Sequence, residues 1–224
     1  DQPDTRPRFA ARLEDWLHVR RARRAISRGK TPSVIPYIGY GSTDWLRVLG
    51  RVLYLKPETR EHTRFRPDVA EVSRVRGWRT FTSLSVPHQP VRVLIDGKHV
   101  TDVVADRGGV IDANIPVSLS PGWHTVTLQT GESEAADAPV NIIDPEARIG
   151  VISDVDDTIL TTALPKPFVA AWNSFVLDEH ARSATPGMAV MLDHLIAEHP
   201  GSPVIYLSTG AWNAAPALSR FLAR

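Results

Sequence analysis

The feature that most constrains the fold is a long run of short alternating segments between Thr31 and Asp144. These segments are rich in Val, Ile and Thr, and alternation of apolar and polar residues is typical of half-buried strands. Turn residues separate the segments at Asp96-Gly97, Gly108-Gly109, Pro121-Gly122 and Gly131. The pattern predicts antiparallel hairpins that form a small β-sandwich or barrel.

Two segments show the alternation most clearly. In residues 45–55 the predicted inner face consists of Leu46, Val48, Val52 and Tyr54. In residues 123–130 it consists of His124, Val126 and Leu128. We interpret Gly39-Tyr40-Gly41 as a turn, because a phosphate-binding loop needs a third glycine and a strand–helix context that this stretch lacks.

A basic amphipathic helix is predicted over residues 8–26. Phe9, Leu13, Trp16 and Leu17 follow helical spacing. Basic residues crowd the stretch that follows: Arg20, Arg21, Arg23, Arg24, Arg28 and Lys30. Such clusters favour contact with an anionic lipid surface. The alternative is a helix that docks on its own domain and leaves a solvated basic face.

After Pro145 the sequence changes to apolar runs and helical spacing. Residues 147–154 and 203–210 each predict a strand buried on both faces, with Ile149, Val151 and Ile152 in the first. Helical spacing between them starts at Thr185, stops at Pro200-Gly201 and involves Met188, Met191, Leu192, Leu195 and Ile196. A second helix begins in residues 213–224, and Thr161–Ala184 is an insertion with a short helix of its own. These elements predict a parallel strand–helix–strand crossover.

Polar residues follow both predicted strands, where open α/β sheets place their sites. Asp154 and Asp156 follow the first strand, two residues apart, so that both carboxylates face one pocket. Ser208, Thr209 and Gly210 follow the second strand and offer a hydroxyl and backbone N–H groups to an anionic phosphate. The pattern predicts a site for phosphate chemistry.

The acidic cluster has three other interpretations. A calcium loop starting at Asp154 lacks suitable residues at three of the five diagnostic positions. Carboxylates that only cap a turn are common, but Asp154, Asp156 and Asp157 would repel one another unless a cation were bound. A metal-binding receiver-like site without hydrolysis stays open.

Charge and composition exclude several classes of protein. The formal net charge is +1, so we expect no nucleic-acid partner. The charge is unevenly spread, because the first 80 residues carry 18 Lys and Arg against 9 Asp and Glu. The sequence has no Cys, which excludes disulfides, Cys-ligated metals and thiol nucleophiles. No run approaches the roughly 20 apolar residues that span a bilayer.

Three stretches carry a resemblance to a known family. They are GVISDVDDTIL, RSATPG and VIYLSTGAWN, all within residues 148–224. A hydrophobic strand, Asp-x-Asp-x-Thr and a later strand ending in Ser resemble the haloacid dehalogenase (HAD) superfamily of phosphohydrolases. Within it, the stretches are similar to the catalytic domain of the actin-patch phosphatidate phosphatase family, in its bacterial members. Fungal members have Ser-Pro where this chain has Gly210-Ala211.

The resemblance implies a mechanism and roles for individual residues. Asp154 would be the nucleophile that forms an aspartyl-phosphate, and Asp156 the general acid and then base. Mg²⁺ would bind the Asp154 carboxylate and the backbone carbonyl of Asp156. Ser208, with Thr209 and Gly210, would hold the phosphate. Asp157 and Thr158 would shape the loop.

These observations give a fold class and a function as expectations. We expect an α+β two-domain chain: a basic helix (1–30), an antiparallel β-sandwich-like domain (31–147), and the first part of a Rossmann-like parallel α/β (HAD-like) catalytic domain (148–224), truncated at its C-terminus. The function expected is Mg²⁺-dependent hydrolysis of phosphatidate to diacylglycerol, in the cytoplasm with peripheral membrane contact. The alternatives are an inert lipid- or protein-binding module and a HAD phosphatase of a soluble phosphate.

Overall fold

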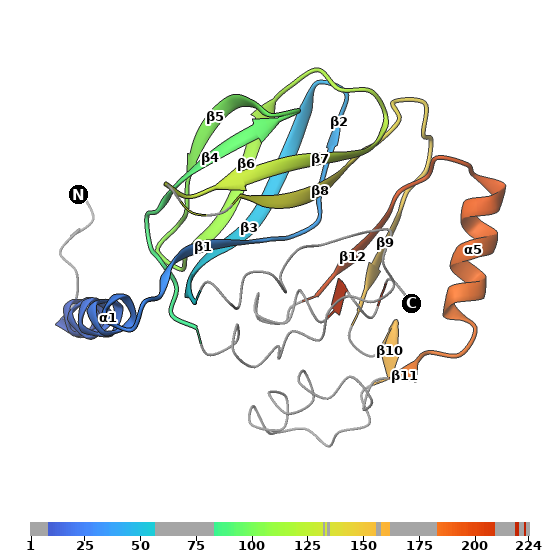
Figure 1. The fold of residues 1–224 in the computed structure, drawn as a ribbon. Coiled ribbons are helices and arrows are strands. Elements are labelled where there is room, and N and C mark those ends of the chain that lie inside the picture. Colours follow the sequence, from blue (N-terminus) through green and yellow to red (C-terminus); the bar gives the residue numbers. More distant parts are fainter. Residues whose placement is uncertain are drawn as a thin grey trace, which may run out of the picture.

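The fold was obtained as a computed structural model, which describes residues 9–56, 83–131, 133, 135–155, 158–161, 183–208, 218, 219 and 222. Its elements are α1 (Phe9–Ser27), β1 (Thr31–Pro36), β2 (Gly39–Ser42), β3 (Trp45–Leu55), β4 (Pro90–Ile95), β5 (Lys98–Val104), β6 (Val110–Pro116), β7 (Gly122–Gln129), β8 (Ala136–Ile142), β9 (Val151–Asp154), β10 (Leu160–Thr161), β11 (Ser183–Ala184), α5 (Met188–Glu198) and β12 (Val204–Leu207). Figure 1 shows the β-rich part, α1 at one end and α5 near the opposite end.

An eight-stranded mixed sheet organises the first part of the chain. Its strand order is β1-β3-β2-β8-β7-β4-β5, and β6 pairs with β3. The long strand β3 is the centre, because it pairs antiparallel with β1, β2 and β6. Most neighbours are antiparallel, but β2 and β8 run parallel. The sheet is therefore mixed, where the sequence predicted antiparallel strands alone.

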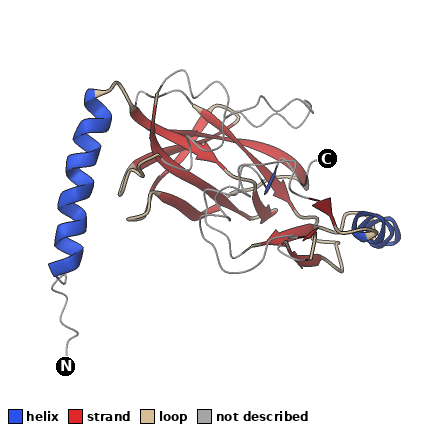
Figure 2. Ribbon diagram, turned by 90° about the horizontal axis from the view of Figure 1, so that it is seen from below, coloured by secondary structure: helices blue, strands red, loops and turns tan. Residues whose placement is uncertain are grey.

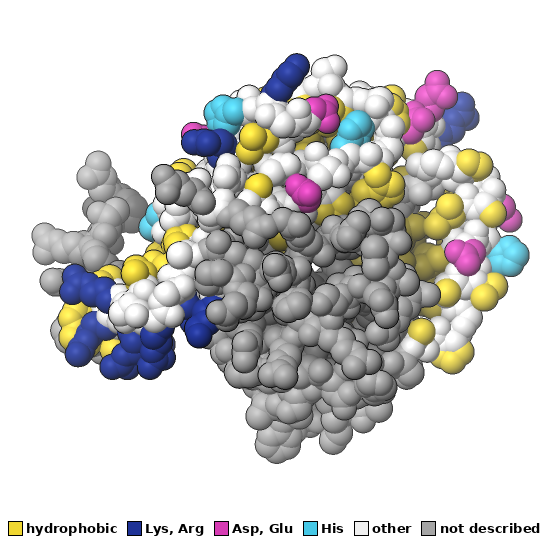
Figure 3. Space-filling model, viewed as in Figure 1, with side chains coloured by type: hydrophobic (Ala, Val, Ile, Leu, Met, Phe, Trp, Pro, Cys, Tyr) yellow, Lys and Arg dark blue, Asp and Glu magenta, His cyan; other side chains and the backbone are white. Residues whose placement is uncertain are grey.

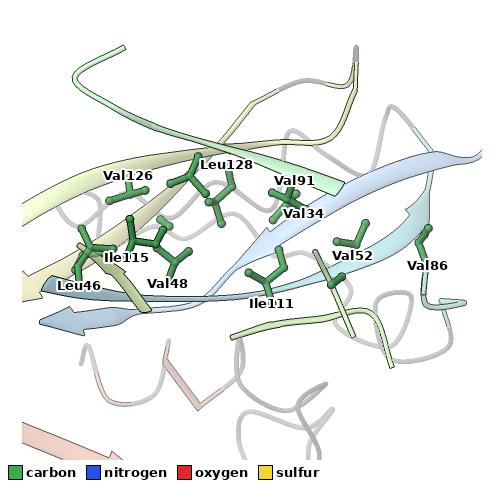
Figure 4. Packing of buried hydrophobic residues seen from close by; sticks show 14 of the residues in the cluster. Val34, Leu46, Val48, Val52, Val86, Val91, Ile111, Ile115, Val126 and Leu128 are labelled. Atoms are coloured by element: carbon green, nitrogen blue, oxygen red, sulfur yellow. The ribbon is translucent and has the colours of Figure 1, made fainter. Parts of the chain in front are cut away.

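The predicted alternation in β3 and β7 is confirmed and builds the hydrophobic core. Leu46, Val48 and Val52 are fully buried, as are Val126 and Leu128 on β7. Side chains of the core cluster meet from several strands in Figure 4. A side chain of Val or Leu size gains roughly 1.5–3 kcal/mol on full burial, so this cluster is the main source of the sheet's stability.

The interpretation of Gly39-Tyr40-Gly41 as a turn is wrong, since these residues belong to strand β2. A Cβ added at Gly41 would overlap the carbonyl oxygen of Trp45, and one at Gly39 would overlap that of Arg47. The two glycines therefore allow β2 to lie against the backbone of β3. Here glycine is required for close approach of two strands rather than for a tight turn.

An ion pair joins β3 to β6 on the outer face of the sheet. Arg47 donates from Nε and Nη2 to the two carboxylate oxygens of Asp112, at 2.7 Å each. Nη1 of Arg47 donates to the hydroxyl of Tyr40 at 2.8 Å. The hydrogen bond from Arg47 holds the pKa of Asp112 below its usual range. This bidentate geometry fixes the relative position of the two strands.

Asp112→Asn is expected to lower the free energy of unfolding by about 0.5–1 kcal/mol at pH 7, since the pair is partly exposed. The folded pKa of Asp112 is lowered, so the pair's contribution is present above the unfolded carboxyl pKa of about 3.9 and is lost as pH falls below it. Urea unfolding at pH 7 and pH 3 measures this dependence. If the free energy of unfolding differed between variant and wild type by the same amount at both pH values, this prediction would be contradicted.

The predicted fold class is wrong for the part of the chain that the structure describes. That part is mostly β, is organised on the mixed sheet, and is not a Rossmann-like α/β domain. Among the described residues after Ala147, strand pairing is limited to β9 with β12 and β10 with β11. The stretch resembled a parallel sheet because β9, α5 and β12 follow one another in the chain, and β9 and β12 do pair in parallel.

The predicted double burial of these two strands is also wrong. Ile152 on β9 is 69% exposed and Leu207 on β12 is 56% exposed. In α5, Leu192 is buried, whereas Met191 and Leu195 are exposed. Two paired strands and one helix offer too little surface to cover every apolar residue that the pattern marked as internal.

The predicted helix over residues 8–26 is confirmed as α1, while the start of α5 differs from expectation. Thr185 does not cap α5: the cap residue is Gly187, with φ of 82°, and the helix begins at Met188. The carbonyl of Thr185, rather than its hydroxyl, accepts from the N–H of Met188 at 3.2 Å. The short helix expected within Thr161–Ala184 lies outside the described residues. Of the helix expected in residues 213–224, only Leu218, Ser219 and Leu222 are described, and they are helical.

Candidate functional site

The parallel pair of β9 and β12 brings two predicted site residues to the same strand ends. In the register of this pair, Leu207 lies opposite Asp154, the last residue of β9. Ser208 follows directly, so it leaves β12 at the edge where Asp154 ends β9 (Figure 1). The strand-end rule therefore brought Asp154 and Ser208 together correctly, although they are 54 positions apart in the chain.

The backbone after Asp154 is fixed by hydrogen bonds. The N–H of Val155 donates to the carbonyl of Leu207 at 3.0 Å, which extends the pairing one residue beyond β9. Val155 is 2% exposed, so its side chain anchors the start of the loop. The N–H of Ile159 then donates to the carbonyl of Val155 at 3.1 Å, closing a turn. Asp154 thus lies between a paired strand and an anchored turn.

Thr185 was predicted only as the start of a helix. Its N–H donates to the carbonyl of Ile159 at 2.9 Å, so the segment before α5 lies against the loop that follows Asp154. Its hydroxyl is buried and has no hydrogen-bond partner among the described residues. Nothing in the local sequence marks this position, because the contact depends on the pairing of β10 with β11.

The carboxylate at the end of β9 is exposed to solvent and has no basic side chain paired with it among the described residues. Asp154 is exposed, and no Lys or Arg among the described residues forms an ion pair with it. The hydroxyl of Ser153 donates to the backbone carbonyl of Asp154 at 3.0 Å. This hydrogen bond does not involve the Asp154 carboxylate. Two residues before Ser208 on β12, burial raises the pKa of Tyr206, and the charge of Asp193 raises it further. Asp154 is therefore accessible to a ligand.

The donors at the strand ends suit a hard divalent cation. Within the described ranges, no three His, Cys, Asp or Glu side chains gather as a metal cage. Mg²⁺ is usually held by one or two carboxylates together with waters and substrate phosphates, rather than by such a cage. An exposed carboxylate beside a strand end fits this mode of binding. Asp156, the other residue predicted to bind the metal, lies outside the described residues, as do Thr209 and Gly210, which were predicted to bind phosphate.

One solved structure is similar to this chain over most of its length. No curated protein matches the chain. A crystal structure of a novel carbohydrate acetylesterase from Xanthomonas citri is similar at 12% identity and a TM-score of 0.33, over 80% of this chain and 40% of that one. The chain therefore spans less than half of the length of that relative.

A family model matches the segment that contains the strand ends. Residues 149–224 match the family described as "Phosphatidate phosphatase APP1, catalytic domain". The match covers β9, α5 and β12, and thus both Asp154 and Ser208. In this segment the chain is similar to the catalytic domain of a phosphatidate phosphatase.

Proposed function

We propose that this protein hydrolyses the phosphomonoester of phosphatidate to diacylglycerol and inorganic phosphate. The observation that carries the proposal is the coincidence of two findings on one segment. Residues 149–224 match a phosphatidate phosphatase catalytic domain, and the same residues place Asp154 and Ser208 at one pair of strand ends. The activity is therefore proposed for the carboxyl ends of β9 and β12.

Asp154 is proposed as the nucleophile. A carboxylate oxygen of Asp154 attacks phosphorus, the bond from phosphorus to the glycerol oxygen breaks, and an aspartyl-phosphate forms. Exposure of Asp154 and the anchored turn behind it support this role, because the nucleophile must be accessible and fixed in direction. Water then attacks the aspartyl-phosphate at phosphorus, which releases inorganic phosphate and restores Asp154.

Asp156 is proposed to move the protons. As a general acid it gives a proton to the departing glycerol oxygen, and as a general base it takes one from the attacking water. A single carboxyl group two residues from the nucleophile can perform both transfers, since the first leaves it ready for the second. Ser208, Thr209 and Gly210 are proposed to hydrogen-bond the phosphate oxygens.

Mg²⁺ is proposed as the cofactor, held by the Asp154 carboxylate and the backbone carbonyl of Asp156. When bound, the ion would offset the repulsion between the anionic nucleophile and the anionic phosphate. No Lys or Arg side chain among the described residues could offset this repulsion, because none of them forms an ion pair with Asp154. A cytoplasmic location stays a prediction. No helix among the described residues is long and apolar enough to span a membrane.

The choice of substrate is tested by phosphate release from three compounds under identical conditions. We expect kcat/KM for phosphatidate in vesicles to exceed that for glycerol 3-phosphate and p-nitrophenyl phosphate by at least about tenfold, since remote binding of the acyl chains contributes to transition-state binding. Faster phosphate release from a soluble compound would show that the substrate is a soluble phosphate and not phosphatidate. Release from none of them would support the inert binding module.

A further inference from the structure

Among its described side chains, helix α1 contacts the rest of the protein through two alanines and one histidine. Ala25 is buried in the core cluster, and Ala22 packs against that cluster. His18 donates from Nε2 to the carbonyl of Ser85 at 3.1 Å. These three residues follow helical spacing and define the inner face of α1. Figure 2 shows α1 joined to the strands at its carboxyl end, with the remainder extending away from them.

The bulky apolar residues of α1 whose side chains are described lie on its exposed side. Trp16 is 53% exposed, Leu17 is 41%, Val19 is 49% and Ile26 is 56%. A helix that only covers its own domain buries its large apolar residues and exposes its small or polar ones. α1 has the reverse arrangement, so its exposed side is suited to a partner outside this fold.

The same exposed side carries a dense cluster of positive charge. The exposed arginines are Arg20, Arg21, Arg23, Arg24 and Arg28. The guanidinium of Arg20 lies over the ring of Trp16, 4.7 Å from its centroid. No ion pair joins these arginines to an acidic group in the described ranges. Figure 3 shows Lys and Arg gathered on α1 beside apolar side chains.

We propose that the exposed side of α1 binds the surface of an anionic bilayer. Trp is favoured at the level of lipid headgroups, and Arg side chains extend from an apolar contact toward phosphates. Each Lys or Arg near an anionic membrane adds about a factor of five in binding. A polyanion without an apolar layer would use the arginines alone and would leave Trp16, Val19 and Ile26 in water. The combination therefore favours a lipid surface over a nucleic acid.

The docking surface is independent of the proposed catalytic site. α1 ends at Ser27, far before Asp154 in the chain, and vesicle binding requires no residue of β9 or β12. If the proposed function is correct, the helix brings the protein to the surface in which phosphatidate is embedded. If it is wrong, the full chain still binds anionic vesicles.

Vesicle sedimentation of the full 224-residue chain tests the proposal. The probe is a vesicle of phosphatidylserine and phosphatidylcholine, compared with phosphatidylcholine alone, at low and at physiological salt. We expect binding to the anionic vesicle that weakens with salt. Arg20→Gln with Arg24→Gln should weaken it about 30-fold, since two cations are removed. Trp16→Ser should weaken binding to vesicles but leave binding to a DNA duplex unchanged.

Matched controls separate the helix from the net charge. Arg92→Gln with Lys98→Gln removes two exposed cations from β4 and β5, and should change binding less than threefold. Asp154→Asn should bind as wild type does, which separates docking from catalysis. The proposal would be overturned if both double variants lost vesicle binding equally, or if the wild type bound neutral and anionic vesicles equally. It would also be overturned if Trp16→Ser left vesicle binding unchanged and the protein preferred the DNA duplex.

Discussion

Asp154→Asn is expected to lower phosphate release from phosphatidate by at least about a thousandfold, the effect typical of removing a covalent nucleophile. The amide of Asn has no anionic oxygen with which to attack phosphorus. The two side chains have nearly the same size, so the pairing of β9 with β12 and the turn after Asp154 should persist. Steady-state release of inorganic phosphate measures the effect.

A nearby carboxylate provides the matched control. Asp193 is exposed on α5 and its charge acts on Tyr206, so Asp193→Asn makes the same chemical change close to the site. We expect this variant to retain activity within about threefold of wild type, because surface changes away from special contacts have small effects. If the Asp154→Asn variant hydrolysed phosphatidate as fast as the Asp193→Asn variant, Asp154 would not be the nucleophile.

Removal of divalent cations is expected to abolish phosphate release as completely as Asp154→Asn does. EDTA should reduce turnover to background, and excess Mg²⁺ should restore it, because without a cation the carboxylate of Asp154 and the phosphate repel each other. The described residues provide no closed metal cage, so we expect binding weak enough for rapid loss and recovery. Activity against free Mg²⁺ concentration measures the dependence.

The same treatment should leave the fold intact, since the eight-stranded sheet is stabilised by an apolar core. We expect the thermal unfolding midpoint to change by no more than about 2 °C with EDTA. Turnover that persists in EDTA would contradict the metal-dependent mechanism. Loss of turnover together with unfolding would instead assign the cation a structural role.

Local patterns in the sequence predicted individual elements well. The alternation of Leu46, Val48 and Val52 marks one face of β3, because successive side chains of a strand point to opposite faces. Helical spacing likewise predicted α1 and α5 within a few residues. Both patterns depend on neighbours in the chain, so no knowledge of the tertiary fold is needed to recognise them.

Long-range pairing could not be predicted in the same way. The parallel pair of β2 and β8 joins Gly39 to Val140, about a hundred residues apart. Gly39 and Gly41 looked like turn residues because the local pattern does not show that this stretch pairs as a strand with the distant β8. The β3 carbonyls that exclude a side chain at these two positions belong to Arg47 and Trp45, which are only eight and four residues away. Burial of Ile152 was misjudged for a related reason, since burial depends on what packs against a strand rather than on its composition.

Part of the candidate site was predicted from one general rule. Polar residues at the ends of two parallel strands meet at one edge, and the register of Leu207 with Asp154 places Ser208 there as expected. Thr185 was not predicted as a neighbour of this loop, because its contact with Ile159 arises from the β10–β11 pairing. The roles of these residues stay proposals that chemistry must test.

The most direct test of the central claim is detection of phosphate bound to Asp154. Wild-type protein is mixed with phosphatidate labelled with ³²P at its phosphate, quenched in acid within a turnover, and assayed for label on the chain. We predict label on wild type and on Asp193→Asn, its release by hydroxylamine as expected for an acyl phosphate, and none on Asp154→Asn. Label that persists on Asp154→Asn, or turnover by wild type with no label on any acidic residue, would contradict the claim.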